Sequence, residues 1–312
     1  MLGVLFASRL RAQATPTSSS SLADPSSTAS SPSATSKSAD VIPAGDFTNQ
    51  YLWTEEFSGS TNSQGQVMSL DSTVGYVFSK RFGVDAGIPI YFVHDTTSTS
   101  TGGTTSTSNT GLGDGYLQLR FAFPNPSLNY KTVFTGTVPT GDTATGLSTG
   151  HVTYDWTNHF DRRFGHWTPF AEAGLGNSIP ANFIFHRPYM SFGNVAHVQG
   201  GAGYRVVDWL SVSASAYDIA PWGTQTIFSR VVGKSGAPIG KGGPMFSVAN
   251  QTTGSSSLAE DNGFSAEADF SPGSVLNFSL GYSHSVHFQL DTFSFGIGVN
   301  MSQLLRRTHA GL

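Results

Sequence analysis

The sequence has no cysteine, few charged residues and no long apolar run. With no cysteine among 312 residues, disulfides, thiolate metal sites and cysteine nucleophiles are excluded. Charged residues make up 12% of the chain, well below the roughly 25% that is usual for soluble domains. The net charge of -4 does not provide the clustered Lys and Arg that nucleic-acid binding requires, so no nucleic-acid partner is expected.

The lack of a long apolar run decides how this chain could cross a membrane. No window holds the ~18 consecutive apolar residues that a spanning helix needs. Any span must therefore consist of strands, and a closed barrel is the only sheet that satisfies its backbone in lipid. The chain is rich in glycine (36) and phenylalanine (23). This composition indicates β-structure whose apolar face meets something other than a deep core.

The N-terminal part differs from the rest of the chain. An apolar run at Leu2–Ala7 is followed by Ala12-Gln13-Ala14, which fits a small-x-small cleavage site. We predict a signal peptide over 1–14, with a mis-assigned or truncated start because no basic residue precedes the apolar run; a disordered leader is the alternative. Residues 15–45 are rich in Ser, Thr and Pro, a composition that predicts a disordered linker.

From residue 46 onward the chain alternates between apolar and polar residues. In the stretch 82–92, FGVDAGIPIYF, the apolar residues from Phe82 to Phe92 occupy every second position, which is typical of a half-exposed strand. Similar segments predict about twelve strands in an antiparallel transmembrane up-and-down barrel over 46–300, followed by a C-terminal tail over 301–312. We place the strands near 47–57, 66–77, 82–93, 113–123, 129–138, 150–160, 167–176, 192–205, 209–219, 262–270, 274–284 and 288–299.

The connections between these segments alternate in length. The short ones are 79–81, 124–128, 161–166, 206–208 and 271–273, and the others are 58–65, 94–112, 139–149, 177–191, 220–261 and the brief 285–287. Short turns on one side and long polar loops on the other are typical of an outer-membrane barrel. Aromatic residues gather near both sets of strand ends, with Tyr91 and Tyr217 among those near the long loops. They predict two interfacial girdles.

Two motifs invite an enzymatic interpretation, and neither has the required context. The stretch 110–121, TGLGDGYLQLRF, has Tyr116 where a dinucleotide fingerprint needs its third glycine, and a strand where it needs a helix. The stretch 146–150, GLSTG, places Ser148 in a G-x-S-x-G pattern without the apolar strand and helix of a nucleophile elbow. His284-Ser285 is the nearest match to the pair used by outer-membrane phospholipases. The His residues are scattered, so we predict no catalytic residue, metal or cofactor.

A set of polar residues lies opposite the apolar positions of the strands. We predict that they line the barrel interior, either as a selectivity-setting pore lining or as a hydrogen-bonded filler, because isolated buried charge is costly. They are Asp85, Gln118, Arg120, Asp155, His159, Glu172, His197, Gln199, Glu267 and Asp269. A barrel of this size lies between filled eight-stranded and open sixteen-stranded barrels, so a narrow or loop-gated pore is expected.

Two stretches resemble one family. Gly111-Leu112-Gly113-Asp114 and Pro139-Thr140-Gly141-Asp142, with Thr149-Gly150 before the next strand, resemble motifs of the outer-membrane proteins of the meta pathway of phenol degradation. The resemblance covers about residues 47–300. It implies a twelve-stranded barrel and passage of small aromatic or hydrophobic compounds.

Together these features predict a channel in the bacterial outer membrane for passive uptake or efflux of small solutes. Its expected partners are outer-membrane lipid, the solute and the barrel-assembly machinery. An outer-membrane barrel hydrolase and a non-conducting structural or interaction barrel remain the alternatives. The sequence does not indicate an oligomeric state.

Overall fold

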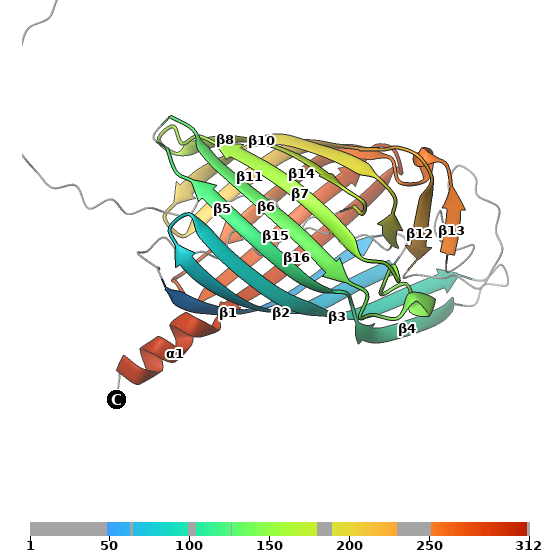
Figure 1. Cartoon of the computed structure of the whole chain (residues 1–312), viewed down its shortest axis with the longest axis horizontal. Coiled ribbons are helices and arrows are strands. Elements are labelled where there is room, and N and C mark those ends of the chain that lie inside the picture. The colour runs from blue at the N-terminus through green and yellow to red at the C-terminus, as the bar shows by residue number, and fades with distance from the viewer. Residues whose placement is uncertain are drawn as a thin grey trace, which may run out of the picture.

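The computed structural model describes residues 49–62, 65–98, 104–125, 127–179, 189–229 and 251–310. Within them, twelve antiparallel strands close into one tilted barrel (Figure 1). The barrel strands are β1 (Gln50–Asn62), β2 (Gly65–Ser79), β3 (Phe82–Ser98), β5 (Gly115–Phe123), β6 (Asn129–Val138), β7 (Thr153–Asp161), β8 (Trp167–Gly176), β10 (Val195–Val207), β11 (Leu210–Pro221), β14 (Asp261–Phe270), β15 (Leu276–Ser285) and β16 (Leu290–Asn300). Each overlaps one of the predicted segments, so the predicted fold is confirmed.

The barrel closes where the two ends of the chain meet. β1 pairs with β16 in antiparallel register from Thr54 opposite Asn300 to Thr61 opposite Phe293. All other barrel neighbours follow chain order, as expected for an up-and-down barrel. Closure pairs every strand edge, which lets the backbone enter lipid without unsatisfied groups.

The ends of several strands differ from the prediction. The segments 58–65 and 94–112 were expected to be loops, but β1 continues to Asn62, β3 continues to Ser98, and β4 (Thr104–Leu112) pairs with β3. These extensions are rich in Ser and Thr. Strand pairing outside a membrane needs no apolar face, so apolar alternation marked the boundaries too early.

The long connections carry a second, smaller sheet. This sheet consists of β9 (Tyr189–Phe192), β12 (Gln225–Ser229) and β13 (Gln251–Gly254). β12, β13 and β4 lie at the same end of the barrel (Figure 1). Two short 3-10 helices, Thr143–Thr145 and Ser256–Leu258, lie in the same connections. We call this the long-loop end and the opposite end the short-turn end. The loops predicted over 177–191 and 220–261 are thus partly sheet, which their irregular composition did not indicate.

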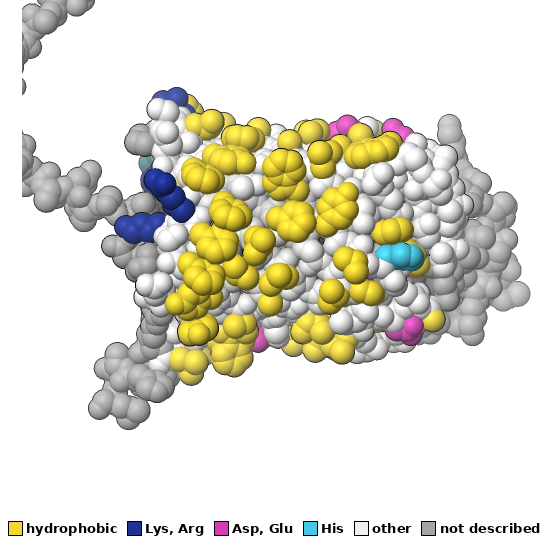
Figure 2. Space-filling model, in the orientation of Figure 1, with side chains coloured by type: hydrophobic (Ala, Val, Ile, Leu, Met, Phe, Trp, Pro, Cys, Tyr) yellow, Lys and Arg dark blue, Asp and Glu magenta, His cyan; other side chains and the backbone are white. Residues whose placement is uncertain are grey.

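The outer surface of the barrel wall is apolar. Leu117, Phe134, Trp156, Leu280 and Phe293 are all exposed there. Figure 2 shows hydrophobic side chains spread over much of the visible wall, with few charged side chains among them. A surface of this extent on a closed barrel is the lipid-facing band of a transmembrane barrel.

Aromatic rings in mutual contact, some stacked and some edge-on, line much of the short-turn end. Consecutive ring centroids lie between 4.6 and 5.1 Å apart in the series Tyr51, Tyr76, Phe78, Phe82 and Phe121. Further pairs, Tyr130–Phe160 and Trp209–Phe270, continue the girdle around the barrel. Such rings are suited to the boundary between lipid and water.

At the other end, two girdle assignments were wrong. Tyr91 and Tyr217 are buried at 7% exposure and point inward. Period-two alternation explains this, because Tyr91 shares a face with Asp85 and not with Phe92.

The predicted C-terminal tail forms a helix, α1 (Met301–Ala310), at the short-turn end (Figure 1). Asn300 caps it, because its Oδ1 accepts a hydrogen bond from the backbone N–H of Gln303 at 3.0 Å. The backbone N–H of Trp53 donates to Ser302 Oγ at 2.8 Å, which ties the helix to β1. Across the described residues, no helix has the length and apolarity to cross a membrane. The signal peptide predicted over 1–14 and the linker predicted over 15–45 both lie outside the described residues.

Candidate functional site

The inner wall of the barrel carries the polar residues that alternate with the lipid-facing set. All ten predicted interior residues lie on barrel strands, at the positions that alternate with the apolar outer ones. Seven of them are buried, namely Asp85, Gln118, Arg120, His159, Glu172, His197 and Gln199. Asp155, Glu267 and Asp269 are partly exposed. Whether these residues select solutes stays a prediction.

An ion pair joins β3 to β5 inside the barrel. Arg120 Nη2 donates to Asp85 Oδ1 at 2.8 Å, and Arg120 Nε donates to Asp85 Oδ2. Each side chain is only 4% exposed. This two-pronged geometry matches a planar guanidinium to a carboxylate and neutralises both charges at the wall.

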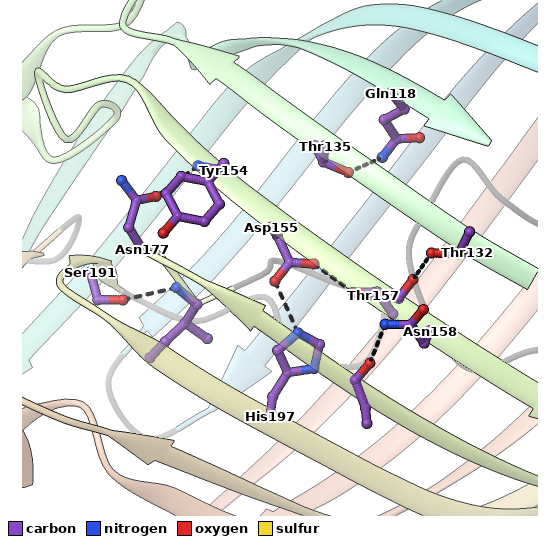
Figure 3. A network of polar contacts seen from close by, with 12 residues as sticks. Gln118, Thr132, Thr135, Tyr154, Asp155, Thr157, Asn158, Asn177, Ser191 and His197 are labelled. Atoms are coloured by element: carbon purple, nitrogen blue, oxygen red, sulfur yellow. Dashed lines mark hydrogen bonds and ion pairs between the residues drawn. The ribbon is translucent and has the colours of Figure 1, made fainter. Parts of the chain in front are cut away.

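A second polar contact crosses an intervening strand. His197 on β10 places Nε2 2.9 Å from Asp155 Oδ1 on β7, although β8 lies between these two strands. Thr157 Oγ1 donates to the other carboxylate oxygen of Asp155. Figure 3 shows Asp155 held between Thr157 and His197.

His159 lies in a further acidic setting near the short-turn end. Its Nε2 and Nδ1 are each 3.5 Å from a carboxylate oxygen, of Asp161 and Glu172 respectively. The imidazole also stacks on Phe170 with ring centroids 5.7 Å apart. Carboxylates thus accompany both interior histidines.

A hydroxyl-rich part of the inner wall was not predicted from the sequence. Buried Ser and Thr residues line the inner faces of β1, β2, β11 and β14–β16, and some bond across strands, as Ser58 does with Ser69 and Ser215 with Ser265. They include Ser60, Ser213, Ser279, Ser283, Thr292 and Ser294. Serine at alternate positions of β11 and β15 was the available signal. Two buried carboxylates, Asp71 and Asp261, were also missed.

The residues that carry the family resemblance contact one another at the long-loop end. Asp114 is buried at 6% exposure, and its two carboxylate oxygens accept from the backbone N–H groups of Gly141 at 3.3 Å and Thr149 at 3.4 Å. Thr140 Oγ1 donates to the backbone C=O of Gly113 at 2.7 Å and accepts from the N–H of Gly115 at 2.8 Å.

The rest of the motif shapes the loop that these bonds hold. Asp142 caps the 3-10 helix Thr143–Thr145, and Gly150 has a positive φ of 68°, which favours glycine. Leu147, 1% exposed, packs in a cluster with Val67, Tyr91 and Val93. The remaining motif residues, Gly111 and Pro139, lie at the end of β4 and directly after β6. The motif therefore fixes the 139–152 loop against the barrel rim.

Replacing Asp114 by Ala should loosen this loop. The backbone N–H groups of partly buried Gly141 and of buried Thr149 would lose their acceptor. Such a loss costs about 1–3 kcal/mol where the group is fully buried. We expect limited proteolysis to cut the 139–152 loop faster in Asp114→Ala than in the unaltered protein, with little change elsewhere. Asp208→Ala, at a residue with a 98% exposed side chain in a short turn, is the matched control. Equal cleavage rates in both variants would contradict the role of Asp114.

The serines of the two enzyme-like patterns, Ser148 and Ser285, each make a hydrogen bond within the protein. Ser148 is 0% exposed, and its Oγ accepts from the backbone N–H of Gly150 at 3.0 Å. Ser285 Oγ points inward and donates to Asp261. His284 lies on the alternate, outer face, 2.8 Å from Asp291. His284 and Ser285 thus face opposite sides of the wall. Within the described ranges no group of three or more His, Cys, Asp or Glu residues could hold a metal ion.

Comparison with known proteins supports the fold. No family model matches the chain, and no curated protein matches it. An outer-membrane channel from Pseudomonas putida F1 superposes with a TM-score of 0.52 at 10% identity, covering 82% of this chain and 97% of that one. The NanC porin gives 0.44 at 8% identity, covering 79% and 98%.

Fold and surface together define the class of the protein. A closed twelve-stranded antiparallel barrel with an apolar outer wall and a polar inner wall is a β-barrel of the bacterial outer membrane.

Proposed function

We propose that the protein is a passive outer-membrane channel for small solutes. The observation that carries this proposal is the division of the wall into an apolar outer face and an inner face of Asp, Glu, Arg, His, Ser and Thr side chains. Polar groups facing inward can replace part of a solute's hydration, while the outer face stays in lipid. The low exposure of the inner wall favours a narrow passage.

The resemblance to the phenol-pathway proteins suggests small aromatic or hydrophobic solutes. An inward-facing apolar cluster at the long-loop end, made by Val67, Tyr91, Val93 and Leu147, supports this solute class. The long-loop end would face outward and the short turns would face the periplasm, as is usual for such barrels.

The charges of the wall predict a preference for cations. Among the ten predicted lining residues, Asp85, Asp155, Glu172, Glu267 and Asp269 are carboxylates, whereas Arg120 is the single Arg or Lys. Because Arg120 is already paired, the remaining field should be negative, and rings of Asp and Glu favour cations.

Conductance in planar bilayers tests the channel directly. We expect discrete conductance steps. In a salt gradient, the reversal potential should have the sign of a cation-selective channel. Asp269→Asn, near the short-turn end of β14, should move the reversal potential toward zero because it removes a mouth carboxylate. Heat-denatured protein in the same preparation is the control, and folded protein without conductance would contradict the proposal.

A non-conducting structural barrel is the second candidate function. It is favoured by the burial of the inner wall, where residues such as Ser283 and Asp85 are only 3% exposed. The same bilayer measurement separates the two, because such a barrel would fold and migrate heat-modifiably without passing current.

A further inference from the structure

Glycines on the inner face lie directly beneath the polar side chains that span the wall. On β2, Gly75 is the cross-strand partner of Asp85. On β3, Gly83 is the cross-strand partner of Arg120. Directly opposed residues share one face of a sheet. The two glycines therefore lie under the two members of the buried ion pair.

A side chain at either glycine would meet this ion pair. A Cβ added at Gly75 would overlap the Asp85 carboxylate, with Asp85 Cγ at 3.2 Å, and one added at Gly83 would lie 3.0 Å from Arg120 Nη2. At Gly83 the nearest backbone atom is farther away, at 3.4 Å. The missing side chains thus leave a recess in which the Arg120–Asp85 pair lies flat.

The same arrangement recurs at two other places on the wall. Tyr116 on β5 donates from its OH to Asp71 on β2 at 2.9 Å, passing over Gly87 of the intervening β3, where an added Cβ would overlap the tyrosine ring. The contact between His197 and Asp155 passes over Gly174 of β8, where an added Cβ would overlap the imidazole. In each case a glycine makes room for a side chain that bridges strands.

We propose that Gly75 and Gly83 form a recess that holds the Arg120–Asp85 pair against the wall and thereby sets the width and charge of the passage at this level. This inference rests on the proposed channel function. With the recess filled, the carboxylate must turn away from the guanidinium. A long cationic side chain would then project toward the barrel axis.

The test is Gly75→Ala, measured as single-channel conductance and reversal potential. We expect the conductance to fall. The reversal potential should shift toward the value of an anion-selective channel, because Arg120 loses its paired carboxylate. The control for adding a methyl group to a strand glycine is Gly136→Ala on the outer face of β6, opposite Leu117, where an added Cβ would have no atom within 4 Å. Gly136→Ala should behave like the unaltered channel.

A second background shows whether the ion pair transmits the effect. In the Asp85→Ala/Arg120→Ala protein, Gly75→Ala should leave conductance unchanged, because no side chain remains to be displaced. An equal fall in both backgrounds, or no fall in either, would overturn the proposal.

Folding controls keep the test decisive. If Gly75→Ala loses heat-modifiable migration, Gly83→Ala replaces it, since its added Cβ makes the milder contact. If both variants fail to fold, folding of Gly75→Ala in the Asp85→Ala/Arg120→Ala background still supports the recess, and failure in that background contradicts it.

If the unaltered protein does not conduct, the channel proposal fails. The thermal midpoints then test the recess, because Gly75→Ala should lower the midpoint only while both side chains are present.

Discussion

Asp85→Ala should lower the free energy of unfolding by about 3–5 kcal/mol, the usual cost of leaving one member of a buried ion pair alone. Arg120 would keep its charge at 4% side-chain exposure with neither Asp85 oxygen to accept from it. Its Nη1 already has no hydrogen-bond partner among the described residues. The guanidinium would then have to leave the wall or remain unpaired.

The double variant Asp85→Ala/Arg120→Ala should recover most of this loss. Removing both members leaves no uncompensated charge, and such replacements are often close to neutral. Urea unfolding in lipid vesicles, followed by tryptophan fluorescence and by gel migration, measures both variants. Asp269→Ala, at a partly exposed inner position, is the control for removing a carboxylate as such. The interpretation fails if Asp85→Ala is no less stable than the double variant.

The strands were predictable because lipid forces a regular pattern on each of them. A segment such as 210–217 alternates Leu, Val and Ala with Ser and Tyr, since one face meets lipid and the other meets the interior. Period two then places Arg120 and Gln118 inside once Leu117 and Leu119 are placed outside. The inner positions of the ten predicted residues follow from this pattern.

The same physics explains what the sequence did not reveal. Beyond the bilayer no apolar face is required, so the extension of β3 to Ser98 and the small sheet of β9, β12 and β13 lacked a periodic signal. Contacts inside the barrel depend on the register between strands. The contact of His197 with Asp155 crosses β8, so predicting it requires the offsets of three strands and the knowledge that Gly174 leaves room.

The motif residues illustrate a third limit. Gly113, Asp114 and Thr140 carry the family resemblance, but their spacing does not indicate what they bind. In the structure they bind one another, through the backbone of the 139–152 loop. The stretch that resembled a phosphate loop is therefore half of a contact that fixes a loop at the rim.

Leu280→Arg should destabilise the barrel by about 2–4 kcal/mol, the cost of Arg or Lys on a lipid-facing strand at the bilayer midplane. Leu280 lies midway along β15, and its side chain is 66% exposed on the outer wall. In lipid that exposed area contacts acyl chains, which cannot solvate a guanidinium.

The matched control is Val286→Arg, which places the same charge in the turn after β15. Val286 is also exposed, at 55%, but it lies beyond the strand end at the long-loop side, where the cost near the interface falls to about 0–1 kcal/mol. Urea unfolding of both variants in vesicles gives the difference directly. The two side chains are similarly exposed on the barrel when no membrane is considered. The comparison therefore tests whether lipid or water surrounds each of them. Equal stability of the two variants would mean that the apolar outer wall does not face lipid. This result would contradict the transmembrane assignment.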